Sequence, residues 1–172
     1  METTSTPADT MMHAEPQKEH RWLEKLVGEW TYEGEAPPEP GKPPEKFTGT
    51  ETVRSLGGLW FLAEGRGPAP GGDEHTSLAT LGYDPTKGHY VGTWIGSMMT
   101  HLWVYERGTL DAAERILTLE AEGPSMSAEG KTARYRDVIE FRSDDERTLT
   151  GNVLGEDGKW QPMMSMTYRR KS

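Results

Sequence analysis

The sequence predicts an all-β protein, an up-and-down barrel of about ten antiparallel strands with a short N-terminal helix at one end. The chain of 172 residues contains 20 glycines and 12 prolines, which favour turns, and six tryptophans and six tyrosines, which favour strands. Apolar and polar residues alternate over many short segments, and the connections between these segments are short. Strands joined in this way lie side by side, and closure of the sheet leaves none of them with a free edge.

The chain divides into a polar tail and one domain. Residues 1–18 contain prolines, show no periodicity and carry little apolar surface, so we expect a disordered N-terminal tail. Residues 19–172 are expected to form a single barrel domain, because a chain of this length is typical of one domain with a substantial core.

Charge and composition narrow the classes of partner. The formal charge of −9 argues against binding to nucleic acid or to an anionic membrane surface, since both reward clusters of Lys and Arg. Without cysteine, the chain has no disulfide, thiolate metal site or cysteine nucleophile. The N-terminus lacks the charged and apolar regions of a signal peptide, and no apolar run approaches the roughly 18 residues of a membrane span. We expect a soluble, cytoplasmic protein.

The first element expected is a helix that begins near Glu19 and ends at Gly28. Its apolar residues recur at helical spacing and form one stripe that must be buried, which consists of Trp22, Leu23, Leu26 and Val27. Glycine commonly follows the last turn of a helix. Beyond Gly28 the period becomes that of a strand, with Trp30 and Tyr32 on one face. The helix is therefore expected to lie across or inside one end of the barrel.

The remaining strands follow one another mostly as hairpins. Five prolines in residues 36–46 make the first connection long and stiff, either a cap over the barrel mouth or a plain surface loop. Gly57 and Gly58 provide one tight turn, and the segment from Pro85 to Gly88 provides another. Nine further strands are predicted, at residues 47–56, 59–67, 76–84, 89–97, 100–108, 115–123, 132–143, 147–155 and 160–170.

Several of these segments carry a family resemblance. They are EHRWLEKLVGEW, SLGGLWFLAEG, LGYDPTKGHYVGTWI, LWVYERGTLD, YRDVIEF, DGKW and YRR, which together extend from Glu19 to Arg170. With these segments the chain resembles the DUF1579 family of uncharacterised bacterial proteins. The resemblance implies a lipocalin-like or calycin barrel, in which a Gly-x-Trp near the first strand is usual, here Gly28, Glu29 and Trp30. It implies no activity and supplies no catalytic residues.

A barrel of about ten strands has an interior that either holds a small ligand or is filled by side chains. The sequence favours binding of a small, largely apolar molecule, because aromatic rings and flexible thioethers adapt to such ligands. The residues expected to line the site are Trp30, Tyr32, Trp60, Trp94, Trp103, Tyr105, Met164 and Met166. The residues expected to anchor a carboxylate or carbonyl group are His101, Arg134 and Arg136.

Each of these residues also has a purely structural interpretation. Tryptophans on strands often serve packing and cross-strand pairing, and methionines fill gaps in cores. Arg134 and Arg136 lie beside Glu140 on one strand face, where exposed ion pairs are worth roughly 0 to 1 kcal/mol. A histidine on an aromatic strand face, such as His101, is often a hydrogen-bonded core residue.

Two chemical alternatives stay open. A haem-binding barrel would use His75, His89 or His101 as an axial ligand, although the residue spacing signals no cofactor or metal site. A barrel enzyme would pair His101 with Asp137 or Glu64 across the lumen. The chain has no Gly-x-Ser-x-Gly, no His-Glu-x-x-His and no phosphate-binding glycine loop to support an enzyme.

Two neighbouring strands are apolar on both faces. Over residues 89–97 and 100–108, neither face of the predicted strand is purely polar. Since an apolar face is commonly covered by another element or another subunit, a structural or interaction protein that acts as a homodimer is a third interpretation.

Overall fold

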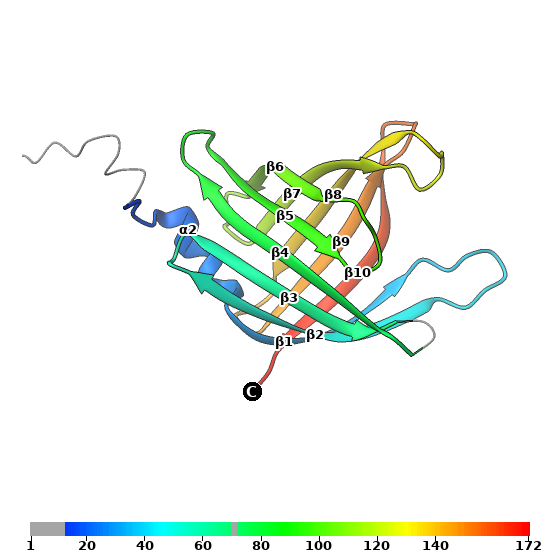
Figure 1. Ribbon diagram of the computed structural model, residues 1–172, viewed down its shortest axis with the longest axis horizontal. Coiled ribbons are helices and arrows are strands. Elements are labelled where there is room, and N and C mark those ends of the chain that lie inside the picture. Colours follow the sequence, from blue (N-terminus) through cyan, green and yellow to red (C-terminus); the bar gives the residue numbers. More distant parts are fainter. Residues whose placement is uncertain (1–12, 70–71) are drawn as a thin grey trace, which may run out of the picture.

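Ten antiparallel strands form a closed barrel in the computed structural model, which describes residues 13–69 and 72–172. Each strand pairs with its neighbours in sequence, and β1 closes the barrel by pairing with β10 (Figure 1). The elements are α2 (Lys18–Leu23), the 3₁₀ turn η1 (Glu24–Leu26), β1 (Gly28–Ala36), β2 (Glu45–Leu56), β3 (Trp60–Pro68), β4 (Glu74–Asp84), β5 (His89–Gly96), β6 (Trp103–Leu110), β7 (Ile116–Pro124), β8 (Thr132–Phe141), β9 (Glu146–Leu154) and β10 (Trp160–Arg170). The predicted ten-stranded barrel with a short N-terminal helix is confirmed.

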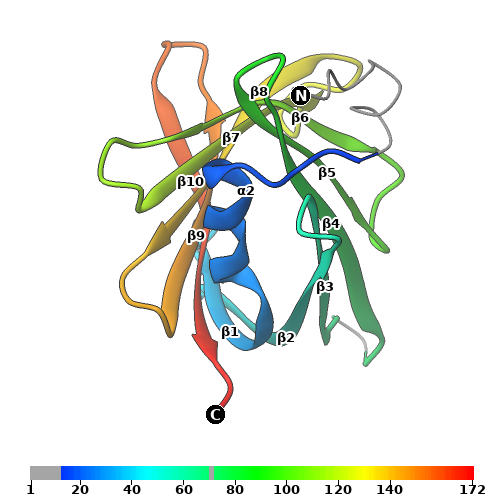
Figure 2. The ribbon, with the colours of Figure 1, turned by 90° about the vertical axis from the view of Figure 1, so that its left-hand side faces the viewer.

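The helix covers one end of the barrel, as Figure 2 shows. Its predicted apolar stripe is buried, since Trp22, Leu23 and Leu26 are at most 6% exposed. His20 is buried as well, which the helical pattern did not indicate. Its Nε2 lies 3.1 Å from the carbonyl oxygen of Tyr83 on β4, so the imidazole ties the helix to the barrel wall.

The chain before the helix is described only from residue 13. The predicted tail, residues 1–18, lies mostly outside the described residues, and its last residue, Lys18, is the first of α2. The backbone N–H of Gln17 donates to Nδ1 of His20 over 3.0 Å and so satisfies one free donor at the start of the helix. The helix therefore begins at Lys18, one residue before the predicted start near Glu19.

Turn chemistry and strand limits agree with the prediction at most positions. Gly57 and Gly58 have φ values of 66° and 76°, which a tight hairpin turn requires and glycine adopts freely. The clearest difference is β6, which begins at Trp103 rather than at residue 100. His101 consequently lies in the connection between β5 and β6 and not on a strand. In the predicted loop of residues 67–74, positions 70–71 lie outside the described residues.

Successive connections alternate between the two ends of the barrel (Figures 1 and 2). Those after β2, β4, β6 and β8 lie at the end covered by α2, which we call the helix end. Those after β1, β3, β5, β7 and β9 lie at the opposite end, which we call the mouth. No helix crosses the mouth in residues 13–69 and 72–172.

The core is concentrated at the helix end. Trp30, Phe61 and Leu117 are at most 1% exposed. The Trp22 ring of the helix packs edge-to-face on Phe141, with 5.6 Å between ring centroids. The helix thus contributes side chains that fill the barrel from one end, and burial of such large apolar groups is the main favourable term in folding.

Candidate functional site

The barrel contains a cavity of about 430 Å³, and all ten strands contribute to its lining. It extends from Met99 and Met126 at the mouth to Leu26 of η1, which forms part of the floor. Sites for small molecules typically have volumes of roughly 300 to 1,000 Å³. The interior is therefore not filled by its own side chains, and its size suits one small ligand.

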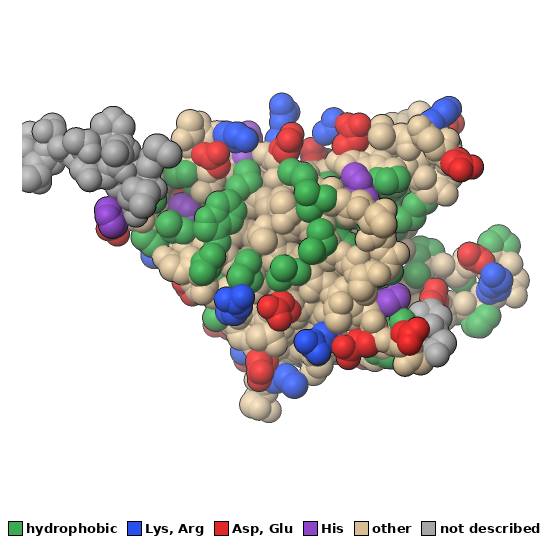
Figure 3. Space-filling model, viewed as in Figure 1, with side chains coloured by type: hydrophobic (Ala, Val, Ile, Leu, Met, Phe, Trp, Pro, Cys, Tyr) green, Lys and Arg blue, Asp and Glu red, His purple; other side chains and the backbone are tan. Residues whose placement is uncertain are grey.

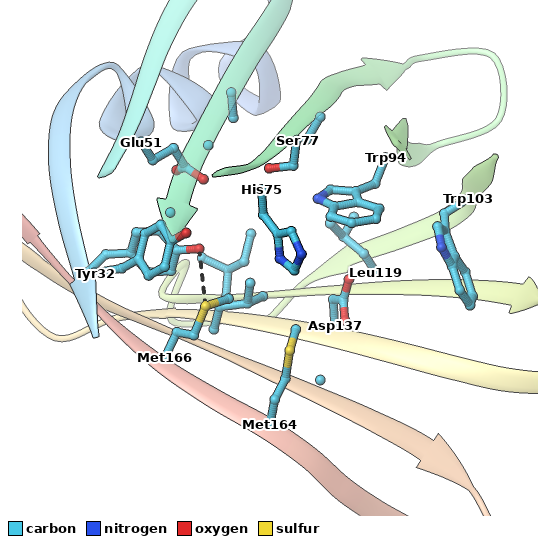
Figure 4. A pocket seen from close by; sticks show the side chains of 18 of the residues that line it. Tyr32, Glu51, His75, Ser77, Trp94, Trp103, Leu119, Asp137, Met164 and Met166 are labelled. Atoms are coloured by element: carbon cyan, nitrogen blue, oxygen red, sulfur yellow. Dashed lines mark hydrogen bonds between the residues drawn. The ribbon is translucent and has the colours of Figure 1, made fainter. Parts of the chain in front are cut away.

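Aromatic rings form one wall of the cavity. Trp94 of β5 and Trp103 of β6 are paired across the two strands, and both line the cavity (Figure 4). Trp103 lies against Gly123 of β7, where any side chain would collide with the indole ring. It also packs edge-to-face on Tyr135 at 4.9 Å, and its Nε1 donates to the sulfur of Met99 over 3.1 Å. These contacts hold the indole in one orientation.

Methionines surround the mouth side of the cavity. Six of them line it, namely Met98, Met99, Met126, Met163, Met164 and Met166. Figure 4 shows Met164 and Met166 of β10 pointing inward. A register shift between Pro162 and Met164 interrupts the pairing of β10 with β9, and both Met163 and Met164 reach the lining. Because thioether side chains are flexible and polarisable, this part of the lining can adapt to the shape of a ligand.

A hydrogen-bonded acid pair lies within this apolar lining. The phenol of Tyr105 donates to Oδ2 of Asp137 over 2.5 Å, and both residues line the cavity. Burial raises the pKa of the Asp137 carboxyl, and the Tyr105 hydrogen bond offsets only part of that rise. Burial, and then the Asp137 charge, raises the pKa of Tyr105 well above its ordinary value, so the phenol stays the donor.

A buried ion pair lies deeper, toward the helix end. The guanidinium of Arg147 donates to Oε1 of Glu51, and the Arg147 side chain is 3% exposed. The guanidinium carbon lies 4.0 Å from the centre of the Tyr168 ring and 4.7 Å from that of Trp30. Burial, and then the Glu51 charge, raises the pKa of Tyr168, which therefore stays neutral. The positive charge of Arg147 is already balanced and shielded by these neighbours.

The structure brings six of the predicted lining residues to the cavity. These are Tyr32, Trp94, Trp103, Tyr105, Met164 and Met166. Each lies on the inward face of its strand, as strand alternation requires. Their contact with a ligand stays a prediction, but their position at the cavity is a property of the structure.

Three predicted residues point away from the cavity, which corrects the expectation that they would line or anchor the site. Trp60 is 43% exposed and lies over Gly82 on the outer surface of the barrel. Arg134 and Arg136 lie on the outer face of β8 and both pair with Glu120, at 3.4 Å and 2.7 Å. The physical reason is the two-residue period, which turns alternate residues of a strand to opposite faces.

Trp30 and His101 also lie outside the lining. Trp30 is fully buried beneath the cavity, and its Nε1 donates to the Leu26 carbonyl oxygen over 2.8 Å. His101 packs its ring edge-to-face on Trp103 at 4.7 Å, from the connection that precedes β6. Trp30 is therefore a core residue. His101 packs against Trp103 without lining the cavity itself.

Of the polar groups that face the cavity, the sequence indicated only His75 and Asp137, and these only within the haem-binding and enzyme alternatives. Glu51, His75, Ser77, Asp137 and Arg147 all line it. Figure 4 shows His75 and Ser77 pointing inward from β4, and Asp137 facing them from β8. The alternation pattern contained the necessary signal for Asp137, which lies two residues from both Tyr135 and Ile139 on one face of its strand. Alternation does not say which face of a strand points inward, and the expected anchors Arg134 and Arg136 lie on the opposite face of the same strand.

The geometry bears on the two chemical alternatives. Of the three histidines considered for haem, His75 lines the cavity, whereas His89 and His101 do not. His101 does not line the cavity, so the proposed pairing of His101 with Asp137 or Glu64 across the lumen is wrong. Glu64 is moreover exposed beside Arg54 on the outer face. Within residues 13–69 and 72–172, no group of three His, Asp or Glu side chains is arranged to hold a metal ion.

The fold and the cavity define a closed antiparallel barrel with one open mouth. The sequence pattern of the family described as protein of unknown function (DUF1579) matches residues 15–170, so the chain belongs to that family. No curated protein matches the chain by sequence. None of the helices in the described part of the chain is long and apolar enough to cross a membrane.

Two solved structures share the fold at low sequence identity. Rv2717c from M. tuberculosis is 15% identical, with a TM-score of 0.61 over 92% of this chain and 100% of that one. An S-type phycobiliprotein lyase from Guillardia theta is 13% identical, with a TM-score of 0.54 over 88% of this chain and 92% of that one. At such identities the likeness concerns the fold alone.

Proposed function

We propose that the protein binds a small, largely apolar molecule inside the barrel. The observation that carries this proposal is the cavity of about 430 Å³, lined mainly by apolar side chains and continuous with the mouth. A domain of this size gains stability from every apolar group that it packs, so an unfilled apolar interior is a costly feature in the absence of a ligand. A few polar groups among many apolar ones is the pattern typical of ligand sites.

Pyrene, a neutral and purely apolar fluorophore, tests the proposal. Its vibronic band ratio reports the polarity around it, so entry into the cavity is visible without a functional assay. The wild-type protein is expected to bind pyrene, and Trp103→Ala is expected to weaken binding at least about tenfold, because the variant removes part of the aromatic wall.

Trp60→Ala is the matched control, since it removes the same side chain from the outer face. It should leave pyrene binding unchanged. Equal loss in both variants, or no binding by the wild-type protein, would contradict the proposal. Native mass spectrometry of the protein purified from its own host would then show whether a molecule already occupies the cavity.

A second proposal concerns the outer face of the barrel. Exposed apolar side chains gather over β3, β5 and β6 on the face seen in Figure 3, among them Trp60, Ile95 and Val104 at 43%, 47% and 42% exposed. Such a patch favours association of two copies through this face. Light scattering of the wild-type protein and of Trp60→Ser tests it, and a monomeric wild-type protein would exclude it.

The cytoplasmic location also stays a proposal. Support comes from the absence of cysteine, which suits a reducing compartment, and from the acidic charge of −9, which suits an aqueous one. Cell fractionation of the host with an antibody against the protein is the direct test, and recovery in the membrane fraction would contradict the proposal.

A further inference from the structure

Asp137 is isolated in the cavity by its neighbours. On the strands beside it, its register partners are Leu119 of β7 and Gly151 of β9, and neither offers a polar side chain. Leu119 and Gly151 both line the cavity. The carboxyl group therefore has no polar register partner on the neighbouring strands, and His75 and Ser77 face it only from across the cavity. A buried position of this kind is expensive for a charge unless a partner is supplied.

One oxygen of this carboxyl group lacks a partner. Oδ2 accepts the hydrogen bond from Tyr105, whereas Oδ1 accepts none from any side chain or backbone group in the described part of the chain. Gly151 keeps the space beside Oδ1 open, because a Cβ atom there would lie 3.5 Å from Oδ1 and 3.2 Å from Cγ of Met164. The free oxygen is thus accessible from the cavity.

Asp137 forms no ion pair with a lysine or arginine in the described part of the chain, whose ion pair in the cavity joins Arg147 to Glu51. Arg147 is the only arginine or lysine among the residues that line the cavity, within the described chain. Arg147 is paired with Glu51 and stacked on Tyr168. The charges of Arg147 and Glu51 therefore cancel. An ionised Asp137 leaves the cavity with one unbalanced negative charge, next to aromatic rings whose faces also attract cations.

From this geometry we infer that the ligand is a hydrophobic amine, bound as its ammonium ion to Oδ1 of Asp137 with its apolar body against Trp94 and Trp103. The inference rests on the proposed function and deepens it by naming the chemical class. An organic anion is disfavoured because the Asp137 carboxylate would repel it and because Arg147, already paired with Glu51, would not compensate its charge. A neutral molecule would leave the Asp137 charge unbalanced.

Three ligands with one aromatic skeleton test the inference, namely naphthylmethylamine, naphthylmethanol and naphthylacetic acid. They differ in charge near neutral pH and little in apolar body. Competition with pyrene should rank the amine at least about tenfold tighter than the alcohol, with the acid weakest. Asp137→Asn should remove the preference for the amine and leave the affinity for the alcohol nearly unchanged, because the cavity keeps its shape.

Glu64→Gln serves as the control for a general charge effect, because Glu64 is an exposed carboxylate on the outer face and should leave the ranking unchanged. Equal affinity for amine and alcohol, or an amine preference that survives in Asp137→Asn, would overturn the inference. So would tighter binding of the alcohol that is lost in Asp137→Asn, which would mean that a protonated Asp137 donates to a neutral ligand. In all these cases pyrene still binds, whereas failure of pyrene itself overturns the proposed function.

The pH dependence gives a second readout. Affinity for the amine should fall as pH is lowered from about 8 to about 4, because Asp137 then gains a proton, while affinity for the alcohol should change little. The other ionisable groups that face the cavity are Glu51, His75, Arg147 and the tyrosines Tyr32, Tyr105, Tyr135 and Tyr168. Because the His75 imidazole also faces the cavity, the profile is repeated in His75→Gln. A fall that disappears in His75→Gln, or is absent in the wild-type protein, would contradict the role of Asp137.

Discussion

The two ends of the barrel are built from the same ten strands but are packed in opposite ways. At the helix end, Trp30 is fully buried between the guanidinium groups of Arg147 and Arg170, 4.7 Å and 4.2 Å from its ring. At the mouth, Met98 and Met126 are 43% and 71% exposed, and the space between the strands is open. The helix end is therefore tightly packed, and the mouth end leaves the cavity open.

Polar contacts also close the helix end. Arg170, the last residue of β10, donates to the carbonyl oxygens of Val27 at 2.6 Å and of Lys25 at 3.0 Å. These carbonyl groups follow the helix and would otherwise need water or another donor. One side chain therefore covers Trp30 and satisfies the end of η1, which joins the first and last segments of the barrel.

The comparison is tested most severely by Trp30→Ala. Removing a fully buried tryptophan should lower the free energy of unfolding by about 3–5 kcal/mol, because a large cavity forms at the packed end. Trp103→Ala, at the mouth, should cost less than half as much. Urea unfolding followed by circular dichroism measures both, and equal costs would mean that the two ends do not differ in packing.

A somewhat smaller effect is expected from the ion pair beneath the cavity. Arg147→Met leaves the Glu51 carboxylate without its partner and should lower the free energy of unfolding by roughly 3 kcal/mol. Adding Glu51→Gln to this variant should recover a large part of the loss, since no charge is then left unpaired. Urea unfolding of the two single variants and the double variant forms a mutant cycle, and simple additivity would contradict the coupling.

Asp137→Asn should stabilise the protein, with an effect that depends on pH. The raised pKa means that the folded state keeps the Asp137 proton to higher pH than the unfolded state does. The wild-type protein therefore loses stability relative to the variant as pH rises from the ordinary value of 3.8 through the folded pKa, and the difference is constant above that range. Urea unfolding of both proteins at a series of pH values from acid to neutral measures this difference in stability. A difference independent of pH would show that titration of Asp137 does not cause it.

The smallest effect on stability is expected where the barrel is hollow. Ala79 lines the cavity between Ala63 and Trp94, its partners on the neighbouring strands. Ala79→Leu adds apolar volume to empty space, so the free energy of unfolding should change by less than about 1 kcal/mol. Pyrene binding should weaken at least about tenfold, because the added side chain occupies the ligand space. Loss of stability without loss of binding would show that the cavity is already filled.

Much of the fold could be read from local patterns. The stripe of Trp22, Leu23 and Leu26, the glycine that follows the helix and the alternation of the strands are properties of neighbouring residues, and the structure agrees with each of them. Six of the eight predicted lining residues reach the cavity for the same reason. The exceptions are Trp60, which lies on the outward face of its strand, and Trp30, which lies inward but below the cavity.

Other features of the candidate site depend on contacts between distant segments. A pattern with a period of two separates two faces of a strand, but it does not say which of them is inside. Arg136, an expected anchor, lies on the outer face, and its neighbour Asp137 faces the cavity. The start of β6 at Trp103, which leaves His101 on a loop, follows from its pairing with β5. Local composition also cannot show that Arg147 and Glu51, 96 residues apart, meet inside the barrel.

By itself, the sequence determined the class of fold, the strands and turns, and the helix that seals one end, because these follow from local periodicity and turn chemistry. Only the tertiary structure decided which residues point inward, how far the helix fills the barrel and where an unbalanced carboxyl group remains. Those properties arise when β1 pairs with β10 and the sheet closes. Closure brings together side chains from all ten strands, and their joint volume and charge cannot be read from any one of them.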